Sequence, residues 1–350
     1  MFPRKLWTQI VVRVARQLDH EQMVNPNLHC GMGYEPLRLA IASYLRIARD
    51  IACSADQILI TAGFQGALGL IIQALLKPGV KVWVEDPGYV SARNLLQQAQ
   101  LGLVGVRIDD GGLDVTAAVR SAPDARLALV TPSHQYPLGS VLSIERRMDM
   151  IKRAREHGAW IIEDDYDSEY RFGSRPIASL QGLDTDGRVI YVGTLSKVMF
   201  PALRLGYVVV PKDLVPAFSA ARDAADIFSS TLYQAVLTDF IREGHFARHI
   251  RRMRMLYMDR PRALVNAIQI QMGDMTKVIG AEAGLHLVAL LPPGTDDVAV
   301  SRKAAQKGIS AIPLSTCYLK PPARCGLILG YGGANAHQIR DGIRKLRMSV

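Results

Sequence analysis

The feature that most constrains the fold of this chain is a regular alternation of short apolar segments with helical segments over its first two thirds. Helical segments such as FQGALGLIIQALL and SIERRMDMIKRAREH have apolar residues three and four positions apart. The apolar runs are too continuous for strands that bury only one face. The pattern predicts a three-layer α/β fold, with a mainly parallel central sheet and helices on both faces. The segments typical of strands are QILIT, KVWVED, LGLVGVRI, RLALVT, AWIIED and RVIYVGT.

The remainder of the chain has a different texture and indicates a second, smaller unit. A long helical region begins near Leu214, and the segments GLHLVALL, ISAIPL and CGLILGY then precede a terminal helix. This order is typical of a smaller α+β C-terminal domain. A chain of 350 residues also exceeds what one hydrophobic core usually serves. We therefore expect an N-terminal arm over 1–30, a large domain over 31–213, a linking helical region over 214–260 and a small domain over 261–350.

The charge balance favours partners that carry negative charge. Lysine and arginine exceed aspartate and glutamate, which gives a formal net charge of +10. Much of this net charge lies in 242–262, which we expect to form one long helix that ends near Pro261. A cationic face in solvent is the plain interpretation of this helix. Packing at a subunit interface, or support of a DNA-bound assembly, is the alternative.

Several classes of protein are disfavoured by composition. No apolar stretch has the length of a membrane span, and the start of the chain does not resemble a signal peptide. We therefore expect no contact with a membrane. The four cysteines show no zinc-site spacing and are too few for a disulfide scaffold, so a reducing cytoplasm is expected. No helix-turn-helix pattern precedes Phe2, so we expect no direct reading of DNA bases by this chain.

Polar residues follow the predicted strands, where ligands of open α/β sheets bind. After QILIT comes Ala62-Gly63-Phe64-Gln65-Gly66 and then a helix, a pattern suited to a phosphate group or simply to a tight turn. Carboxylates gather in EDDYDSE at 163–169, and such crowding of like charge requires a metal ion or a protonated ring nearby. Lys197 follows another strand, and the hydroxyl-bearing residues Thr194 and Ser196 lie just before it. It is suited to Schiff-base chemistry, or is a solvated loop lysine.

Five ordered motifs resemble those of one family. The chain is similar to fold-type I aminotransferases that depend on pyridoxal 5′-phosphate. It is most similar to the aminotransferase-like domain of MocR-type regulators of the GntR family, in which a winged-helix domain precedes this module. The segment RHIRRMRMLY at 248–257 is typical of that subgroup. The motifs are VEDPGY at 84–89, TPSHQYPLG at 131–139, EDDYDSEYRF at 163–172, GTLSK at 193–197 and LRLGY at 203–207.

The resemblance implies catalytic roles for three residues. Lys197 matches the lysine that forms a Schiff base with the cofactor and then moves a proton from the substrate. Asp164 matches the carboxylate that pairs with the pyridine nitrogen. Tyr166 matches the hydroxyl near the phenolic oxygen of the ring.

Further residues are implied to bind cofactor and substrate. Tyr89 would stack on the cofactor ring. The turn of the family usually carries an Asn where this chain has Tyr136, so we expect His134 and Gln135 to supply the polar contact. We expect Arg324 to bind the substrate carboxylate. The arm motif of the family is altered at 28–33, which leaves the contact made there open. The residues implied to bind the phosphate and its surroundings are Gly63, Phe64, Gln65, Thr194, Ser196 and Arg204.

Two functions follow from the resemblance. In the first, the chain is an aminotransferase that moves an amino group between an amino acid and a 2-oxo acid. In the second, it is the effector-sensing module of a regulator, which binds pyridoxal 5′-phosphate and an amino-acid ligand with little or no turnover. The resemblance also implies a homodimer and no metal ion.

Overall fold

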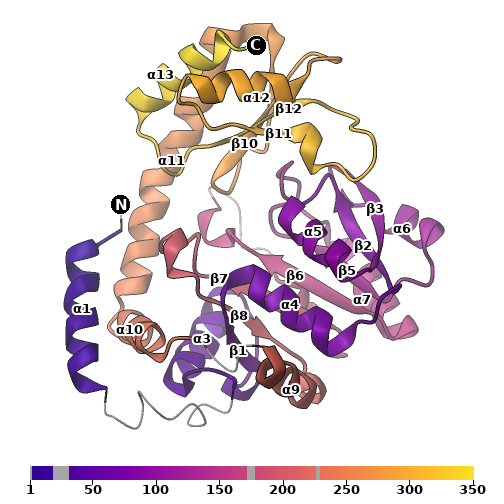
Figure 1. The fold of residues 1–350 in the computed structure, drawn as a ribbon, viewed down its shortest axis with the longest axis vertical. Coiled ribbons are helices and arrows are strands. Elements are labelled where there is room, and N and C mark those ends of the chain that lie inside the picture. Colours follow the sequence, from indigo (N-terminus) through magenta and orange to yellow (C-terminus); the bar gives the residue numbers. More distant parts are fainter. Residues whose placement is uncertain (1, 19–30, 172–177, 226–228) are drawn as a thin grey trace.

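The computed structural model describes residues 2–18, 31–171, 178–225 and 229–350 of the chain. Residues 28–30 of the altered arm motif lie outside the described residues, whereas 31–33 are described, and Phe172 at the end of the EDDYDSEYRF motif also lies outside them. Two sheets organise the described part (Figure 1). The larger sheet holds the strands that the sequence predicts in its first two thirds, and the smaller sheet belongs to the C-terminal part.

The larger sheet has eight strands in the order β1-β8-β7-β6-β5-β2-β3-β4. The strands from β7 through β6, β5 and β2 to β3 are parallel, whereas β8 is antiparallel to both β7 and β1. The sheet is therefore mixed rather than parallel throughout. The strands are β1 (Ile58–Thr61), β2 (Lys81–Asp86), β3 (Gly102–Asp109), β4 (Gly112–Leu113), β5 (Leu127–Val130), β6 (Trp160–Asp165), β7 (Val189–Thr194) and β8 (Gly206–Val209).

The reversed direction of β8 has a consequence for the site. Because β8 runs against its neighbours, β1 points the same way as β7, and the first residue of β8 lies at the edge where the other strands end. The carboxyl ends of β1, β7, β6, β5 and β2 therefore share one edge with the start of β8. Residues far apart in the sequence meet along this edge.

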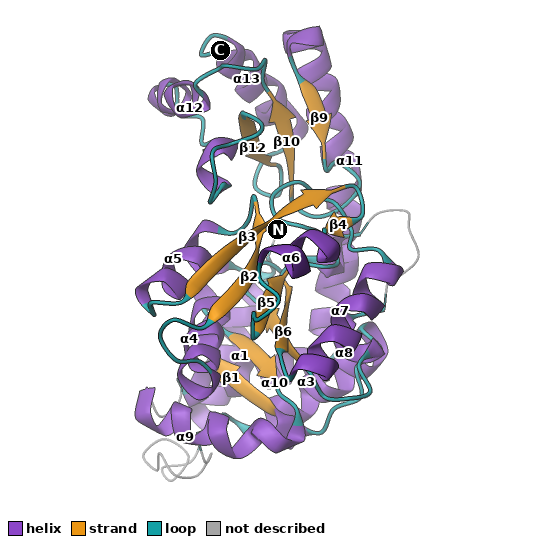
Figure 2. Cartoon of the chain, turned by 90° about the vertical axis from the view of Figure 1, so that its right-hand side faces the viewer, coloured by secondary structure: helices purple, strands orange, loops and turns teal. Residues whose placement is uncertain are grey.

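Helices cover both faces of the larger sheet, so the predicted three-layer architecture is confirmed (Figure 2). Alternate residues of each strand serve opposite faces. In β1, Leu59 packs with α4, whereas Ile58 and Ile60 pack on the side of α1, α3 and α10. The helices are α1 (Arg4–Gln17), α3 (Glu35–Ala48), α4 (Gly63–Leu75), α5 (Val90–Gln98), α6 (Val115–Ser121), α7 (Ile144–His157), α8 (Leu180–Leu183), α9 (Val215–Ala225) and α10 (Thr231–Arg242).

The first helix contributes to the core of the larger sheet. Its residues Trp7, Ile10 and Val14 are buried, and α1 packs against α10 (Figure 1). Burial of these side chains against α10 supplies the core that the arm could not form alone.

The C-terminal part is built on an antiparallel sheet in the order β11-β12-β10-β9. One face of this sheet packs on three helices through a cluster that includes Leu287, Leu327 and Leu329. The other face turns towards the larger sheet. The elements are α11 (His245–Met272), β9 (Lys277–Ile279), β10 (His286–Leu290), α12 (Asp297–Gln306), β11 (Ile312–Pro313), β12 (Gly326–Gly330) and α13 (Ala336–Arg347).

The long basic helix ends later in the sequence than predicted. α11 continues for more than two turns beyond Pro261, because Pro261, Leu264 and Ile268 are buried and the last two join the core of the C-terminal part. That burial offsets the usual cost of a proline inside a helix. Two arginines of α11 make hydrogen bonds within the protein. Arg254 donates to the carbonyl of Glu169, and Arg260 donates to the carbonyls of Tyr331 and Gly332. Part of the positive charge therefore ties α11 to neighbouring segments.

None of the described helices has the length and apolar character that crossing a membrane requires.

Candidate active site

A cavity of about 620 Å³ lies between the shared edge of the larger sheet and the smaller sheet. Its floor comes from residues after β1, β6 and β7 and before β8, and its roof comes from β10, β11 and β12. Most of the predicted site residues meet there. Those that line it are Phe64, Gln65, Tyr89, Asp164, Tyr166, Thr194, Ser196, Lys197 and Arg204.

Lys197 provides the amine of the cavity. It follows β7 by three residues and is solvent-exposed. The backbone N–H of Ser196 donates to the Oγ1 of Thr194 at 3.3 Å, which shapes the turn that holds the lysine. The hydroxyl of Ser196 is buried and has no hydrogen-bond partner in the described part of the chain. The turn therefore presents an amine and an unused hydroxyl to the cavity.

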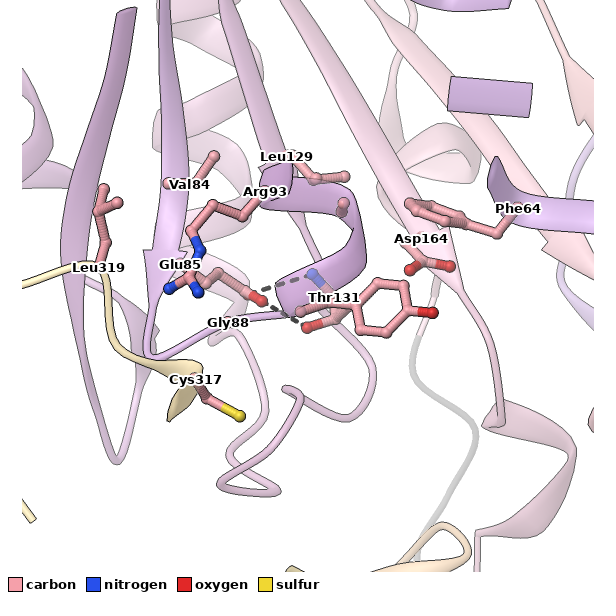
Figure 3. Close-up of a pocket in the computed structure, with 12 residues that line it drawn as sticks. Phe64, Val84, Glu85, Gly88, Arg93, Leu129, Thr131, Asp164, Cys317 and Leu319 are labelled. Carbon is pink, nitrogen blue, oxygen red and sulfur yellow. Dashed lines mark hydrogen bonds between the residues drawn. The ribbon is translucent and has the colours of Figure 1, made fainter. Parts of the chain in front are cut away.

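Asp164 provides a buried carboxyl. It lies in β6 and is 6% exposed, and its Oδ1 has no hydrogen-bond partner among the described residues. Burial, followed by the negative charge of Asp165, raises the pKa of Asp164 well above its usual value. Figure 3 shows the carboxyl beside Phe64, in an adjoining pocket that also holds Glu85 and Thr131. A carboxyl in this state is suited to a cationic N–H group of a ligand.

Glu85 shows how a neighbouring carboxyl at this edge is satisfied within the protein. Its two carboxyl oxygens accept hydrogen bonds from the backbone N–H and the hydroxyl of Thr131 at 3.1 and 2.6 Å (Figure 3). Burial raises its pKa to about 7. The contrast with Asp164 is informative, since only Asp164 lacks a protein donor at one oxygen and lines the larger cavity.

Tyr166 is positioned by a histidine behind it. Its hydroxyl lies 2.9 Å from Nδ1 of His134, and the same nitrogen lies 3.0 Å from Oδ2 of Asp167. Because a carboxylate accepts hydrogen bonds, Nδ1 carries the proton, and the hydroxyl proton of Tyr166 is free for an acceptor in the cavity. His134 is buried and does not line the cavity, so it supports Tyr166 rather than facing a ligand.

The start of α4 and Arg204 form a cationic corner. Gly63, the first residue of α4, has a φ of +74°, a conformation that glycine adopts without strain. Gly206 allows the start of β8 to approach closely, since a Cβ atom there would lie 2.9 Å from the Cα of Gly63. Arg204 adopts the left-handed conformation with φ of 51° and donates to the carbonyl of Ala62 at 3.2 Å. Its guanidinium thus lies beside the free N–H groups of a helix start, which is an anion-binding arrangement.

Gln65 adds a further donor at this corner. Its Nε2 is buried and has no hydrogen-bond partner among the described residues, although the residue lines the cavity. Together with Arg204 it could meet several oxygens of one anion.

Aromatic residues form one side of the cavity. Tyr89 is 40% exposed, and its ring contacts Phe64 and Tyr136 edge to face at centroid distances of 5.9 and 5.7 Å. Tyr136 lines the cavity, whereas Gln135 does not. The Nε2 of Gln135 donates to the carbonyl of Pro87, and its Oε1 accepts from the N–H of Leu138. The side chain of Gln135, which we expected to touch the cofactor, therefore holds the turn, and Tyr136 is the residue of this turn that lines the cavity.

Arg324 is placed elsewhere, which corrects the expectation that it faces this cavity. It lies before β12, beside a different surface hollow formed with Leu291, Pro293 and Cys325. The cavity contacts the opposite end of the strand, at Ile328 and Gly330. A strand rises about 3.3 Å per residue, so Arg324 is separated from Gly330 by roughly 20 Å.

The roof residues were missed by the sequence analysis. They are mostly apolar and lie within strands or short loops, where a core role is the usual interpretation. The only signal was the histidine in GLHLVALL, a polar residue inside an apolar strand. The residues are Leu285, His286, Ser310, Ile312, Ile328 and Gly330.

A buried ion-pair cluster lies behind the cavity. Arg49, which follows α3, donates from Nε to Oδ2 of Asp165 at 2.7 Å, and its Nη2 lies 2.8 Å from Oε1 of Glu169. The second contact is an ion pair whose angle lies outside hydrogen-bond geometry. Tyr44 also donates to Glu169, and Tyr191 donates to Asp165. The cluster fixes Asp165, the neighbour of Asp164, on the opposite side of β6.

Comparison with known proteins agrees with this geometry. The family model for aminotransferase class I and II matches residues 9–327. The probable rhizopine catabolism regulatory protein MocR of Rhizobium meliloti is 39% identical over 346 residues, which cover 99% of this chain and 69% of that protein. Aromatic-amino-acid aminotransferase 1 of Thermococcus litoralis is 27% identical over 325 residues, which cover 91% of this chain and 78% of that protein.

A solved structure supports the same assignment. The kynurenine aminotransferase of Pyrococcus horikoshii, in complex with PMP, superposes with a TM-score of 0.90 at 26% identity, covering 99% of this chain and 87% of that one. The similarity in fold extends over both sheets. The chain therefore belongs to the aminotransferase class I and II family and has the fold-type I architecture of its pyridoxal-phosphate-dependent members.

Proposed function

We propose that this chain binds pyridoxal 5′-phosphate covalently through Lys197 and transfers an amino group between an amino compound and an oxo compound. The observation that carries this proposal is the convergence of Lys197, Asp164 and Arg204 on one cavity from three separate strand ends. The family supports the use of this cofactor. The resemblance of the motifs gives amino acids and 2-oxo acids as the substrates of such transfers.

The residues present fit the cofactor. The unpartnered Oδ1 of Asp164 suits a protonated ring nitrogen, since burial without a partner is costly for a carboxyl. The helix start at Gly63, together with Arg204 and Gln65, suits a phosphate. Tyr89 lines the same cavity and would lie against the aromatic ring of the cofactor.

Pyridoxal 5′-phosphate, when bound, supplies an aldehyde that condenses with primary amines and a ring that withdraws electrons from the neighbouring carbon. Lys197 Nζ would hold that aldehyde until an incoming amine displaces it, and the freed amine would then move the proton at the reacting carbon. Tyr166 would donate its free hydroxyl proton to an oxygen of the ring. In the complete exchange, the donor carbon is oxidised from amine to carbonyl and the acceptor carbon is reduced from carbonyl to amine, so no external oxidant is required.

A second candidate function is ligand sensing. The 39% identity to MocR, a probable regulatory protein, extends over 99% of this chain. In this case the same cavity would bind the cofactor and an amine ligand. The output would be a conformational change of the protein on ligand binding, and no product would be released.

The two functions are separated by turnover. The cofactor-loaded protein is incubated with a panel of amino compounds, with and without 2-oxoglutarate, while the cofactor spectrum and the products are followed. Repeated product formation supports the aminotransferase. A spectral change without product supports ligand sensing, and the absence of any spectral change with every amine contradicts both.

Replacement of Asp164 by asparagine tests the role of the buried carboxyl. We expect Asp164→Asn to retain the cofactor but to slow conversion to its amine form at least about tenfold, because a neutral amide holds the ring nitrogen protonated less well. The rate of a single half-reaction with excess amine measures this effect. An unchanged rate would remove Asp164 from the proposed mechanism.

Replacement of Arg204 tests the phosphate corner. We expect Arg204→Ala to weaken cofactor affinity by about 1.5–3 kcal/mol, the usual contribution of a hydrogen bond to a charged group. Arg204→Lys keeps the positive charge but lacks the two-pronged guanidinium group. Its cofactor affinity should therefore lie between those of the unchanged protein and Arg204→Ala. Equilibrium titration with pyridoxal 5′-phosphate measures the affinities, and equal affinity of all three proteins would place the phosphate elsewhere.

A further inference from the structure

The cavity has few cationic side chains, and each of them already has a role in the proposed function. Among the described residues that line it, only Lys197 and Arg204 carry a positive charge. In the proposed function Lys197 holds the cofactor and Arg204 lies at the helix start that suits the phosphate. No lining residue of the described chain is left to neutralise a second anion.

The roof of the cavity is mostly apolar. Ile312 and Ile328 are cross-strand partners in the small antiparallel sheet, so their side chains adjoin on one face. Leu285 also lines the cavity, and it packs against Tyr170 and Tyr257. Of the described roof residues, Leu285, Ile312 and Ile328 present hydrocarbon, and none carries a fixed positive charge.

His286 does not replace the missing cation. Its Nε2 lies 3.1 Å from the carbonyl oxygen of Pro137 and donates to it, which leaves Nδ1 as an acceptor. Burial, followed by the proximity of His134, lowers the pKa of His286 to about 4, so the ring is neutral at physiological pH. A neutral ring with a free acceptor nitrogen favours a hydroxyl or N–H group and disfavours a carboxylate.

We infer that the amino compound of this cavity is a primary amine without an α-carboxylate, held by its neutral body against Leu285, Ile312 and Ile328. This inference rests on the proposed function and narrows its substrate class. An α-carboxylate bound under this roof would lose its hydration without gaining a cation, which is unfavourable for any ionised group. Hydroxyl groups on the amine would find acceptors or donors at His286, Tyr136 and Ser310.

Matched ligand pairs that differ only in the carboxylate test the inference. The cofactor-loaded protein is titrated with 3-methylbutylamine and with L-leucine, and then with 2-phenylethylamine and with L-phenylalanine. The cofactor spectrum gives one binding curve, and the shift of the thermal midpoint gives a second that does not depend on turnover. We expect each amine to half-saturate the protein at a concentration at least about tenfold below that of its amino acid.

A charge placed in the roof should change this preference. Ile328→Arg is expected to shift the preference towards the amino acid of each pair, whereas the apolar control Ile328→Met should keep the preference for the amine. Because Ile328 is buried, Ile312→Arg at an exposed position of the neighbouring strand provides a second variant if Ile328→Arg does not fold.

The outcomes separate this inference from the function on which it rests. Tighter binding of the amino acids to the unchanged protein would overturn the inference, and so would a lack of response to all four ligands. In either case a visible absorbance of the cofactor bound to Lys197 would leave the proposed attachment to Lys197 intact, and the wider panel of amino compounds would decide the transfer. Absence of that absorbance would instead overturn the proposed function.

Discussion

Replacement of Lys197 by alanine is expected to abolish the visible absorbance of the cofactor–lysine bond. Among the described residues that line the cavity, Lys197 is the only lysine, so no neighbouring amine can form the same bond. Cofactor that still binds through the phosphate corner should give the spectrum of the free aldehyde. Borohydride reduction followed by peptide mass analysis should then find no lysine modified, whereas the unchanged protein should carry the cofactor on the peptide that contains Lys197.

Lys212→Ala is a suitable control for this variant. Lys212 is exposed near the end of β8 and does not line the cavity, so its loss should leave the absorbance unchanged. A visible band that persists in Lys197→Ala, with borohydride trapping the cofactor on another lysine, would overturn the assignment.

The largest effect on stability is expected at Arg49. We expect Arg49→Met to lower the free energy of unfolding by about 3–5 kcal/mol, because it leaves the buried carboxyls of Asp165 and Glu169 without their cation. Methionine preserves most of the apolar length of the arginine side chain. The decrease in the free energy of unfolding therefore measures the effect of removing the charge. Denaturant titration measures the free energy of unfolding. The exposed ion pairs of Arg13 provide the control, since Arg13→Met should change the unfolding midpoint little.

The carboxyls offer two further checks on this explanation. Arg49→Met made together with Asp165→Asn and Glu169→Gln should cost less than Arg49→Met alone, since no buried charge is then orphaned. Burial opposes ionisation of Asp165, but Arg49 and the hydrogen bonds of Ser168 outweigh it and lower the pKa of Asp165. A lowered carboxyl pKa stabilises the fold at neutral pH and ceases to do so as the pH falls through that pKa. The difference between the unchanged protein and Arg49→Met should therefore narrow in acid, and a cost equal to that of Arg13→Met would contradict the role of Arg49.

The strands of the larger sheet could be predicted because their sequence signal is local. Runs such as QILIT and RVIYVGT are apolar on both faces, and the structure confirms a strand at each. The direction of β8 could not be predicted in this way, because the segment LRLGYVVV is equally apolar whether the strand runs parallel or antiparallel to its neighbours. Pairing with β7 and β1 decided it. The short helices α6 and α12 were missed, because their stability depends on packing more than on their own pattern.

The floor of the cavity was largely predictable, but the roof was not. Lys197 and Arg204 flank strands of one sheet, Asp164 lies near the end of β6, and all three belong to motifs that resemble a family. Ile312 and Ile328 resemble any core residues in the sequence. A homodimer, which the resemblance also implies, remains a prediction.

The sequence by itself determined the chemical groups at the ends of the strands, because parallel strands that carry them must end along one edge. Tertiary structure alone decided which side chains face those groups from the other sheet. It placed Ile328 over the cavity, whereas Arg324 lies just before the other end of β12, beside a different hollow. In an extended chain, residues only a few positions apart lie in different surroundings. The neutral roof, and with it the kind of amine that we infer, follows from that packing.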